Sequence, residues 1–175
     1  MKLRLFAVLL IGCIGLASPG FAAEASPLVG KWKLDAARSS SFKPWDAIDL
    51  EIAAKGDALV LTRKLTWTLD RKSEDVITVK PDDTTVTVNP LKYWVDTWFN
   101  NAYIGGDHAQ HVKGGWLDHG RILKLDINFD LELQQGDYPV HVYREYRLST
   151  DHNTLKVYEL RSTRDQPLTF IYTRA

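Results

Sequence analysis

The segment from residue 123 to residue 133 alternates strictly between apolar and polar side chains. Leucine, isoleucine and phenylalanine occupy every odd position, while lysine, aspartate, asparagine and glutamate occupy every even one. An α-helix repeats every 3.6 residues and would scatter these apolar side chains around its surface, whereas a strand places them all on one face. The segment therefore predicts a long β-strand with one buried face.

The same two-residue period recurs along most of the chain, with turn residues between the runs. It is clear in residues 48–52, 59–69 and 138–148. Because 175 residues suffice for one sizeable core, we expect one domain over residues 24–175. The predicted fold is all-β: a single antiparallel lipocalin-like β-barrel of about eight to ten strands, with a β-sandwich as the alternative. The turns separating the strands are expected at Lys55-Gly56-Asp57, Pro81-Asp82-Asp83, Gln135-Gly136-Asp137 and Asp151-His152-Asn153.

One stretch departs from this period. Asn89 is a residue type that caps helices, Pro90 suits a first turn, and apolar side chains then recur at helical spacing up to Phe99. The spacing predicts one short amphipathic helix over residues 90–100, either a plug packed on one barrel end or a cover over a ligand cavity.

The first residues indicate export. Lys2 and Arg4 form a short basic start, residues 5–17 are apolar or small, and small residues follow at the spacing that a signal peptidase reads. We expect residues 1–23 to be a signal peptide and the mature protein to be periplasmic or secreted. The alternative is a lipoprotein, in which Cys13 is lipidated and anchors the chain to a membrane.

Composition limits the partners and the source of stability. The chain carries 22 basic and 22 acidic residues and would lose two of the basic ones with the signal peptide. This near-neutral balance gives no indication of nucleic-acid binding, and membrane attachment is expected only if Cys13 is lipidated. Since Cys13 is the one cysteine, the mature chain would depend on its core and not on disulfides.

Two short patterns carry a family resemblance. Gly30-Lys31-Trp32 opens the domain with a Gly-x-Trp motif, and Arg174 stands near the end of the last predicted strand. The pair resembles lipocalins and the wider calycins, in which the tryptophan closes one end of the barrel and the arginine lies across its ring. Residues 28–42 and about 143–174 resemble small exported bacterial lipocalin-like proteins. The resemblance implies a structural barrel-closing role for Trp32 and Arg174.

Two arginines occupy positions where strict alternation aims the side chain into the barrel. A buried, unpaired guanidinium is costly, so Arg63 and Arg144 must each meet a carboxylate, from the protein or from a ligand. The Arg144-Glu145-Tyr146 sequence resembles the Arg-x-Tyr pair with which fatty-acid-binding barrels hold a ligand carboxylate. Two alternatives stay open: a β-bulge that turns the arginine outward, or an internal salt bridge to a residue such as Glu159.

These residues support the hypothesis of an exported binding protein for a small hydrophobic or amphipathic ligand, with an anion favoured by the arginines. No cofactor is expected. The residues assigned to the ligand site are the anchors Arg63, Arg144 and Tyr146 and the apolar wall or cover Trp67, Trp94 and Trp98.

Histidines suggest a competing kind of site. His108, His111 and His119 fall in a loop-like stretch with aspartates nearby, and imidazole nitrogens suit zinc or copper. A haem-binding barrel with one of these histidines as axial ligand is a related alternative. A further alternative is a cell-envelope interaction module whose barrel is filled by its own side chains.

Catalysis has the least support. The sequence contains no Gly-x-Ser-x-Gly, no His-Glu-x-x-His and no phosphate-cradling glycine loop. No catalytic residue is therefore assigned, and an enzyme on the same scaffold ranks last.

Overall fold

The chain forms one long antiparallel sheet that curls into a nearly closed barrel. The computed structural model describes residues 26–68, 70–95 and 102–175. Ten strands pair in the order β4-β3-β2-β1-β12-β11-β10-β9-β8-β5, and β6 and β7 form a separate two-stranded sheet. The strands are β1 (Gly30–Leu34), β2 (Ala47–Lys55), β3 (Ala58–Thr66), β4 (Lys72–Val79), β5 (Val86–Pro90), β6 (Tyr93–Trp94), β7 (Ala102–Tyr103), β8 (Ala109–Leu117), β9 (Ile122–Leu133), β10 (Gly136–Leu148), β11 (Thr154–Arg161) and β12 (Leu168–Arg174).

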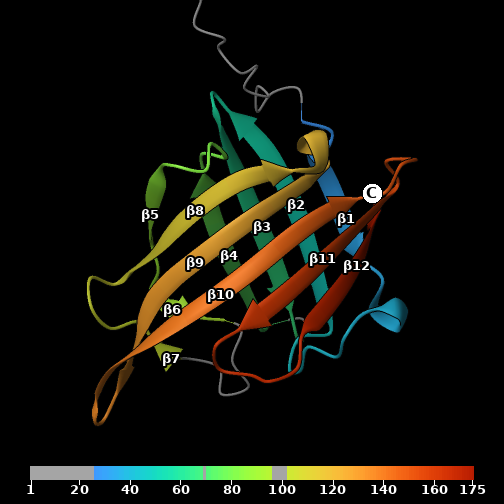
Figure 1. Cartoon of the computed structure of the whole chain (residues 1–175). Coiled ribbons are helices and arrows are strands. Elements are labelled where there is room, and N and C mark those ends of the chain that lie inside the picture. Colours follow the sequence, from blue (N-terminus) through green and yellow to red (C-terminus); the bar gives the residue numbers. More distant parts are fainter. Residues whose placement is uncertain (1–25, 69, 96–101) are drawn as a thin grey trace, which may run out of the picture.

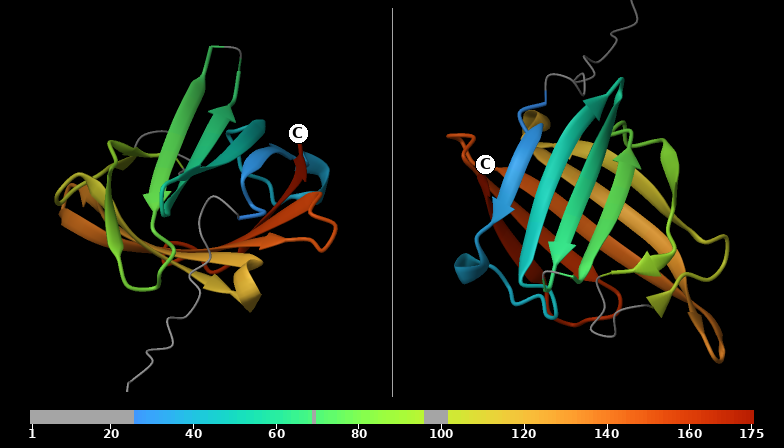
Figure 2. Two further views of the ribbon diagram at one scale, coloured as in Figure 1. Left: turned by 90° about the horizontal axis from the view of Figure 1, so that it is seen from above. Right: turned by 180° about the vertical axis from the view of Figure 1, so that it is seen from behind.

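Two walls of strands face each other across the core. Figure 1 shows β8 to β12 in front and β2 to β4 behind them, and Figure 2 shows the rear wall from the opposite side. The prediction of an antiparallel all-β barrel is confirmed by this pairing. Within the described residues the only helical elements are two 3-10 turns, η2 (Ala36–Arg38) and η3 (Asp118–Gly120). No helix among them is long and apolar enough to cross a membrane.

The alternating segment behaves as predicted, except at its end. The odd-numbered side chains of β9 from Leu123 to Leu131 are buried, whereas Leu133 is 46% exposed. Tyr138, which follows on β10, is exposed to the same degree. The reason is that the β9–β10 hairpin extends beyond the rest of the barrel (Figure 1), so its tip has nothing to pack against.

The prediction of a helix over residues 90–100 is wrong for the residues that the structure describes there. Pro90 ends β5 and pairs with Ala109, and Trp94 lies in β6 opposite Ala102. Trp94 packs edge-on against Phe129 of β9, with ring centroids 5.2 Å apart. Pairing with distant strands has thus overridden a local helical spacing. Residues 96–101 lie outside the described residues.

Trp32 and Arg174 lie against each other at one end of the barrel, the contact that the calycin resemblance implies. Trp32 is buried and is the register partner of Arg174, whose guanidinium carbon lies 4.3 Å from the centre of its ring. The indole Nε1 donates a hydrogen bond to the Leu28 carbonyl, and Arg174 donates to the Pro27 and Val29 carbonyls. Gly30 makes room for this arginine, because a Cβ there would lie 2.6 Å from Arg174 Nη1. The glycine of the Gly-x-Trp motif is therefore required for steric reasons, because a side chain there would collide with Arg174.

A side chain joins the two edge strands of the sheet. No backbone ladder connects β4 to β5 in the described residues. Instead, the Asn89 amide accepts a hydrogen bond from the Thr78 N–H at 2.7 Å and donates one to the Thr78 carbonyl at 3.0 Å. Asn89, predicted to cap a helix, substitutes for a strand-to-strand pair at this seam.

We predict that Gly30→Ala lowers the free energy of unfolding by about 1–3 kcal/mol, because the φ of +145° suits glycine and the new Cβ clashes with Arg174. Urea denaturation measures the effect. In an Arg174→Ala background the same change should cost less, since the clash is gone. An equal loss in both backgrounds would contradict the close approach.

We also predict that Asn89→Ala speeds hydrogen exchange of the Thr78 amide by about tenfold, because a net hydrogen bond of about 1.5 kcal/mol is lost. Exchange monitored by NMR measures this. The Leu59 and Leu61 amides of β3 serve as internal references. Unchanged protection at Thr78 would show that the seam is held by packing alone.

Candidate ligand-binding site

A buried ion pair joins β3 to β4 inside the barrel. Arg63 and Asp75 are register partners, and both are more than nine-tenths buried. The Arg63 guanidinium donates from Nε at 3.0 Å and from Nη2 at 2.5 Å, both to the same Asp75 oxygen. The inner-face position of Arg63, predicted from alternation, is therefore confirmed, and a protein carboxylate meets it.

A second ionic group lies on the facing wall. Glu159 of β11 is 1% exposed and is held by two arginines. One of its oxygens accepts from Arg144 Nε at 2.5 Å, and the other accepts from Arg161 Nε. The salt bridge to Glu159, left open by the sequence as an alternative, is what Arg144 makes. We call Arg63, Arg144 and Arg161 with Asp75 and Glu159 the guanidinium cluster.

Two tyrosines lie beside the guanidinium cluster. Tyr146 and Tyr172 are each 2% exposed. Burial raises the pKa of both phenols, and the positive charges of Arg63 and Arg144 offset part of that rise. Both side chains are therefore neutral hydroxyl groups at physiological pH and add uncharged polar groups to the interior beside the cluster.

Aromatic rings cover the cluster at the barrel end opposite Trp32. The Arg161 guanidinium carbon lies 5.4 Å from the ring centres of both Phe42 and Trp94. Phe42 comes from the loop between β1 and β2, and Trp94 from β6. The two segments are joined by a hydrogen bond of 2.9 Å from the Trp45 indole to the Val95 carbonyl. Arginine and aromatic rings attract each other through cation–π contact, so the cover and the cluster stabilise one another.

A small cavity lies beside the guanidinium cluster. A cavity of about 10 Å³ lies between the two walls and is bounded by Arg63, Asp75, Arg144 and Trp94. Gln110 of β8 also lines it, is 3% exposed, and has an amide Nε2 with no hydrogen-bond partner among the described residues. Such a void has about the volume that one water needs. Any larger ligand must displace side chains to reach this point.

The sequence-assigned ligand residues do not all gather here. Arg63, Arg144 and Tyr146 are inside together, and Trp94 covers them. Trp67, by contrast, lies in the turn after β3, with the Arg71 guanidinium 4.8 Å from its ring centre. Trp67 is not among the residues that line the described cavity, because β3 ends one residue before it. Trp98 lies outside the described residues.

The histidine hypothesis also needs correcting. His108 bonds the Ile104 carbonyl through Nδ1 at 2.6 Å, and His111 bonds Asp107 through Nε2 at 2.9 Å. His119 lies in η3, beyond the opposite end of the nine-residue strand β8. Strand geometry separates His108 from His119 by roughly 30 Å. The described residues contain no group of three metal-ligating side chains.

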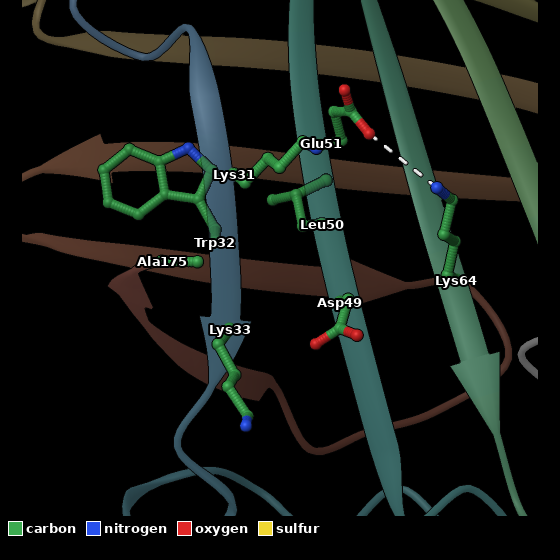
Figure 3. Close-up of a pocket in the computed structure, with 8 residues that line it drawn as sticks. All are labelled: Lys31, Trp32, Lys33, Asp49, Leu50, Glu51, Lys64 and Ala175. Atoms are coloured by element: carbon green, nitrogen blue, oxygen red, sulfur yellow. Dashed lines mark ion pairs between the residues drawn. The ribbon is translucent and has the colours of Figure 1, made fainter.

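A hollow on the outer face of β1, β2 and β3 is a weaker candidate (Figure 3). It measures about 270 Å³, and its charged side chains come from alternating positions on the three strands. Lys31 and Lys33 stand opposite Glu51 and Asp49 in register, and Lys64 lies 3.7 Å from Glu51. Opposite charges thus face each other across the strands, as expected of a solvated sheet face.

Several residues of the site were not assigned from the sequence. Asp75 and Gln110 share an inward face with Ile77 and Val112, two residues away, and Arg161 follows Val157 and Glu159 on the inward face of β11. The alternation of inward and outward side chains that placed Arg63 and Arg144 in the barrel places these residues there as well. Alternation does not identify Phe42, because Phe42 lies in a loop, where side chains do not alternate between two faces.

No family model and no curated protein sequence matches the chain. Among solved structures, the fatty-acid-binding protein isolated from Manduca sexta is similar over 83% of this chain and 98% of that chain, at 11% identity and a TM-score of 0.46. The assignment of this chain to the antiparallel barrel class rests on its own strand pairing.

We predict that Glu159→Gln lowers the free energy of unfolding by about 3 kcal/mol or more, because it removes the buried carboxylate between two guanidinium groups. The matched control is Glu51→Gln, which removes the exposed partner of Lys64 and should cost less than about 1 kcal/mol. Urea denaturation compares the two. Similar losses would show that the interior is far more solvated than its burial indicates.

Proposed function

We propose that this barrel binds a small carboxylate-bearing organic molecule at the guanidinium cluster. The observation that carries the proposal is the cluster itself: three arginines and two carboxylates buried in the interior of a barrel whose other inward side chains are mainly apolar. A core meant only for stability would be served as well or better by apolar side chains, because desolvating ion pairs offsets most of their attraction.

The donor set suits a carboxylate. Guanidinium groups present planar pairs of N–H donors that match the two oxygens of a carboxylate. The Gln110 amide adds a buried N–H whose hydrogen bond no described residue accepts. Buried donors in native structures normally have an acceptor, which here a ligand oxygen or a water would supply. The neutral Tyr146 and Tyr172 hydroxyls add polarity without adding negative charge.

We also propose that the protein acts outside the cytoplasm. Support comes from the basic start at Lys2 and Arg4, the apolar stretch to residue 17 and the small residues after it. Lipidation at Cys13 is the competing form of the same proposal, because the residues before it resemble a lipobox.

A second candidate function has an observation of its own. The cavity between the described residues beside the cluster measures about 10 Å³, and each arginine of the cluster meets a protein carboxylate. Both facts suit an interaction module whose barrel is filled by its own side chains. The ligand-binding proposal requires instead that the aromatic cover yields to a ligand.

Isothermal titration calorimetry with octanoate and octan-1-ol distinguishes the two. We expect octanoate to bind at least about tenfold more tightly than the alcohol, because a charge-assisted hydrogen bond contributes about 1.5–3 kcal/mol. Gln110→Met should weaken octanoate binding, whereas Gln134→Met, on the exposed β9–β10 hairpin, should not. Absence of heat with octanoate, from protein with an intact β-sheet circular dichroism spectrum, would favour the filled module.

A further inference from the structure

The void beside the guanidinium cluster is far too small for the body of an organic ligand. Ligand pockets in proteins usually measure about 300–1,000 Å³. The interior cavity has about 10 Å³, but the loop between β1 and β2 bounds an open groove of about 370 Å³. The groove is lined by Leu34, Ala36, Ser39, Ser40, Ser41, Phe42, Lys43, Trp45 and Asp46.

Phe42 lies between the groove and Arg161 of the cluster. Phe42 lines the groove, yet it is 9% exposed and packs edge-on against Phe170 of β12 at 5.3 Å. The Arg161 guanidinium lies 5.4 Å from the centre of the same ring. The Phe42 ring therefore contacts both the groove and the Arg161 guanidinium of the cluster.

The groove is suited to an apolar ligand chain, because most of its polar groups already have hydrogen-bond or ion-pair partners in the protein. The Ser39 and Ser40 hydroxyls accept hydrogen bonds from the Ile171 and Thr169 amides of β12. Lys43 pairs with Asp46 at 2.9 Å at the rim. The Trp45 indole N–H is held by Val95. The apolar contact surface of the groove comes from Leu34, Ala36 and Trp45, together with the accessible edge of Phe42.

We infer that the ligand is an amphipathic monocarboxylate whose apolar body lies in this loop groove, outside the barrel, with its carboxylate turned past Phe42 toward Arg161. The inference rests on the proposed function and adds the class of ligand and its placement. It follows from the two volumes, from the apolar surface of the groove and from the position of Arg161 behind Phe42. The barrel interior then recognises only the head of the ligand.

NMR of the wild-type protein with octanoate tests the placement directly. We expect nuclear Overhauser contacts from the octanoate chain to the ring protons of Trp45 and Phe42, and a shift of the Arg161 Nε–H resonance. Contacts from the chain to Ile127 and Val142, which line the interior cavity, would overturn the inference and leave the proposed function standing. Absence of octanoate binding would overturn both.

A groove-filling substitution gives an independent measurement. Ser41→Trp places a large ring in the groove from an exposed position, and it should weaken octanoate binding about tenfold or more, a loss of about 1.4 kcal/mol. Gln135→Trp adds the same ring to the exposed hairpin tip and is the matched control. Equal affinities in the two variants would overturn the groove placement. If Ser41→Trp does not fold, the wild-type contacts decide alone.

Discussion

The buried ion pairs tie the register of the strands to the interior of the barrel. Arg63 stands directly across from Asp75, and Arg144 directly across from Glu159, on paired strands. A slip of two residues between the paired strands would keep the apolar side chains inward but would move each arginine away from its carboxylate. Because an isolated buried charge is costly, these pairs favour one register out of several that apolar alternation alone would accept. The same arginines and carboxylates also supply the charged groups of the barrel interior.

The two ends of the barrel differ in what covers them, and only one of the two coverings lies over the guanidinium cluster. At one end, Trp32 and Arg174 are fixed by backbone carbonyls of the segment that precedes β1. At the other end, the guanidinium cluster is covered by side chains from the β1–β2 loop and β6, joined by the Trp45–Val95 hydrogen bond. A cover built from a loop and a two-residue strand costs less to displace than the long paired strands of the walls, so this end offers the lower-cost route to the cluster.

The elements that the sequence predicted well are those with a repeated local signal. Strict alternation identified β9, and the same parity aimed Arg63, Arg144 and Tyr146 inward as the structure has them. Parity predicts the direction of a side chain but not its partner, so a salt bridge and a ligand contact looked alike from the sequence. The helical spacing after Pro90 misled because Trp94 finds its partner, Phe129, 35 positions farther along the chain.

The sequence by itself determined that this chain makes a barrel of antiparallel strands and that two arginines and a tyrosine point into it, because alternation acts residue by residue. Only the tertiary structure decided that Glu159 bridges two arginines, that Asn89 joins the edge strands, and that the described side chains around the guanidinium cluster leave a cavity of about 10 Å³. These outcomes depend on which strands meet and on how side-chain volumes sum across the barrel. Strand pairing and interior packing both depend on residues far apart in the chain, so no single stretch of sequence determines either of them.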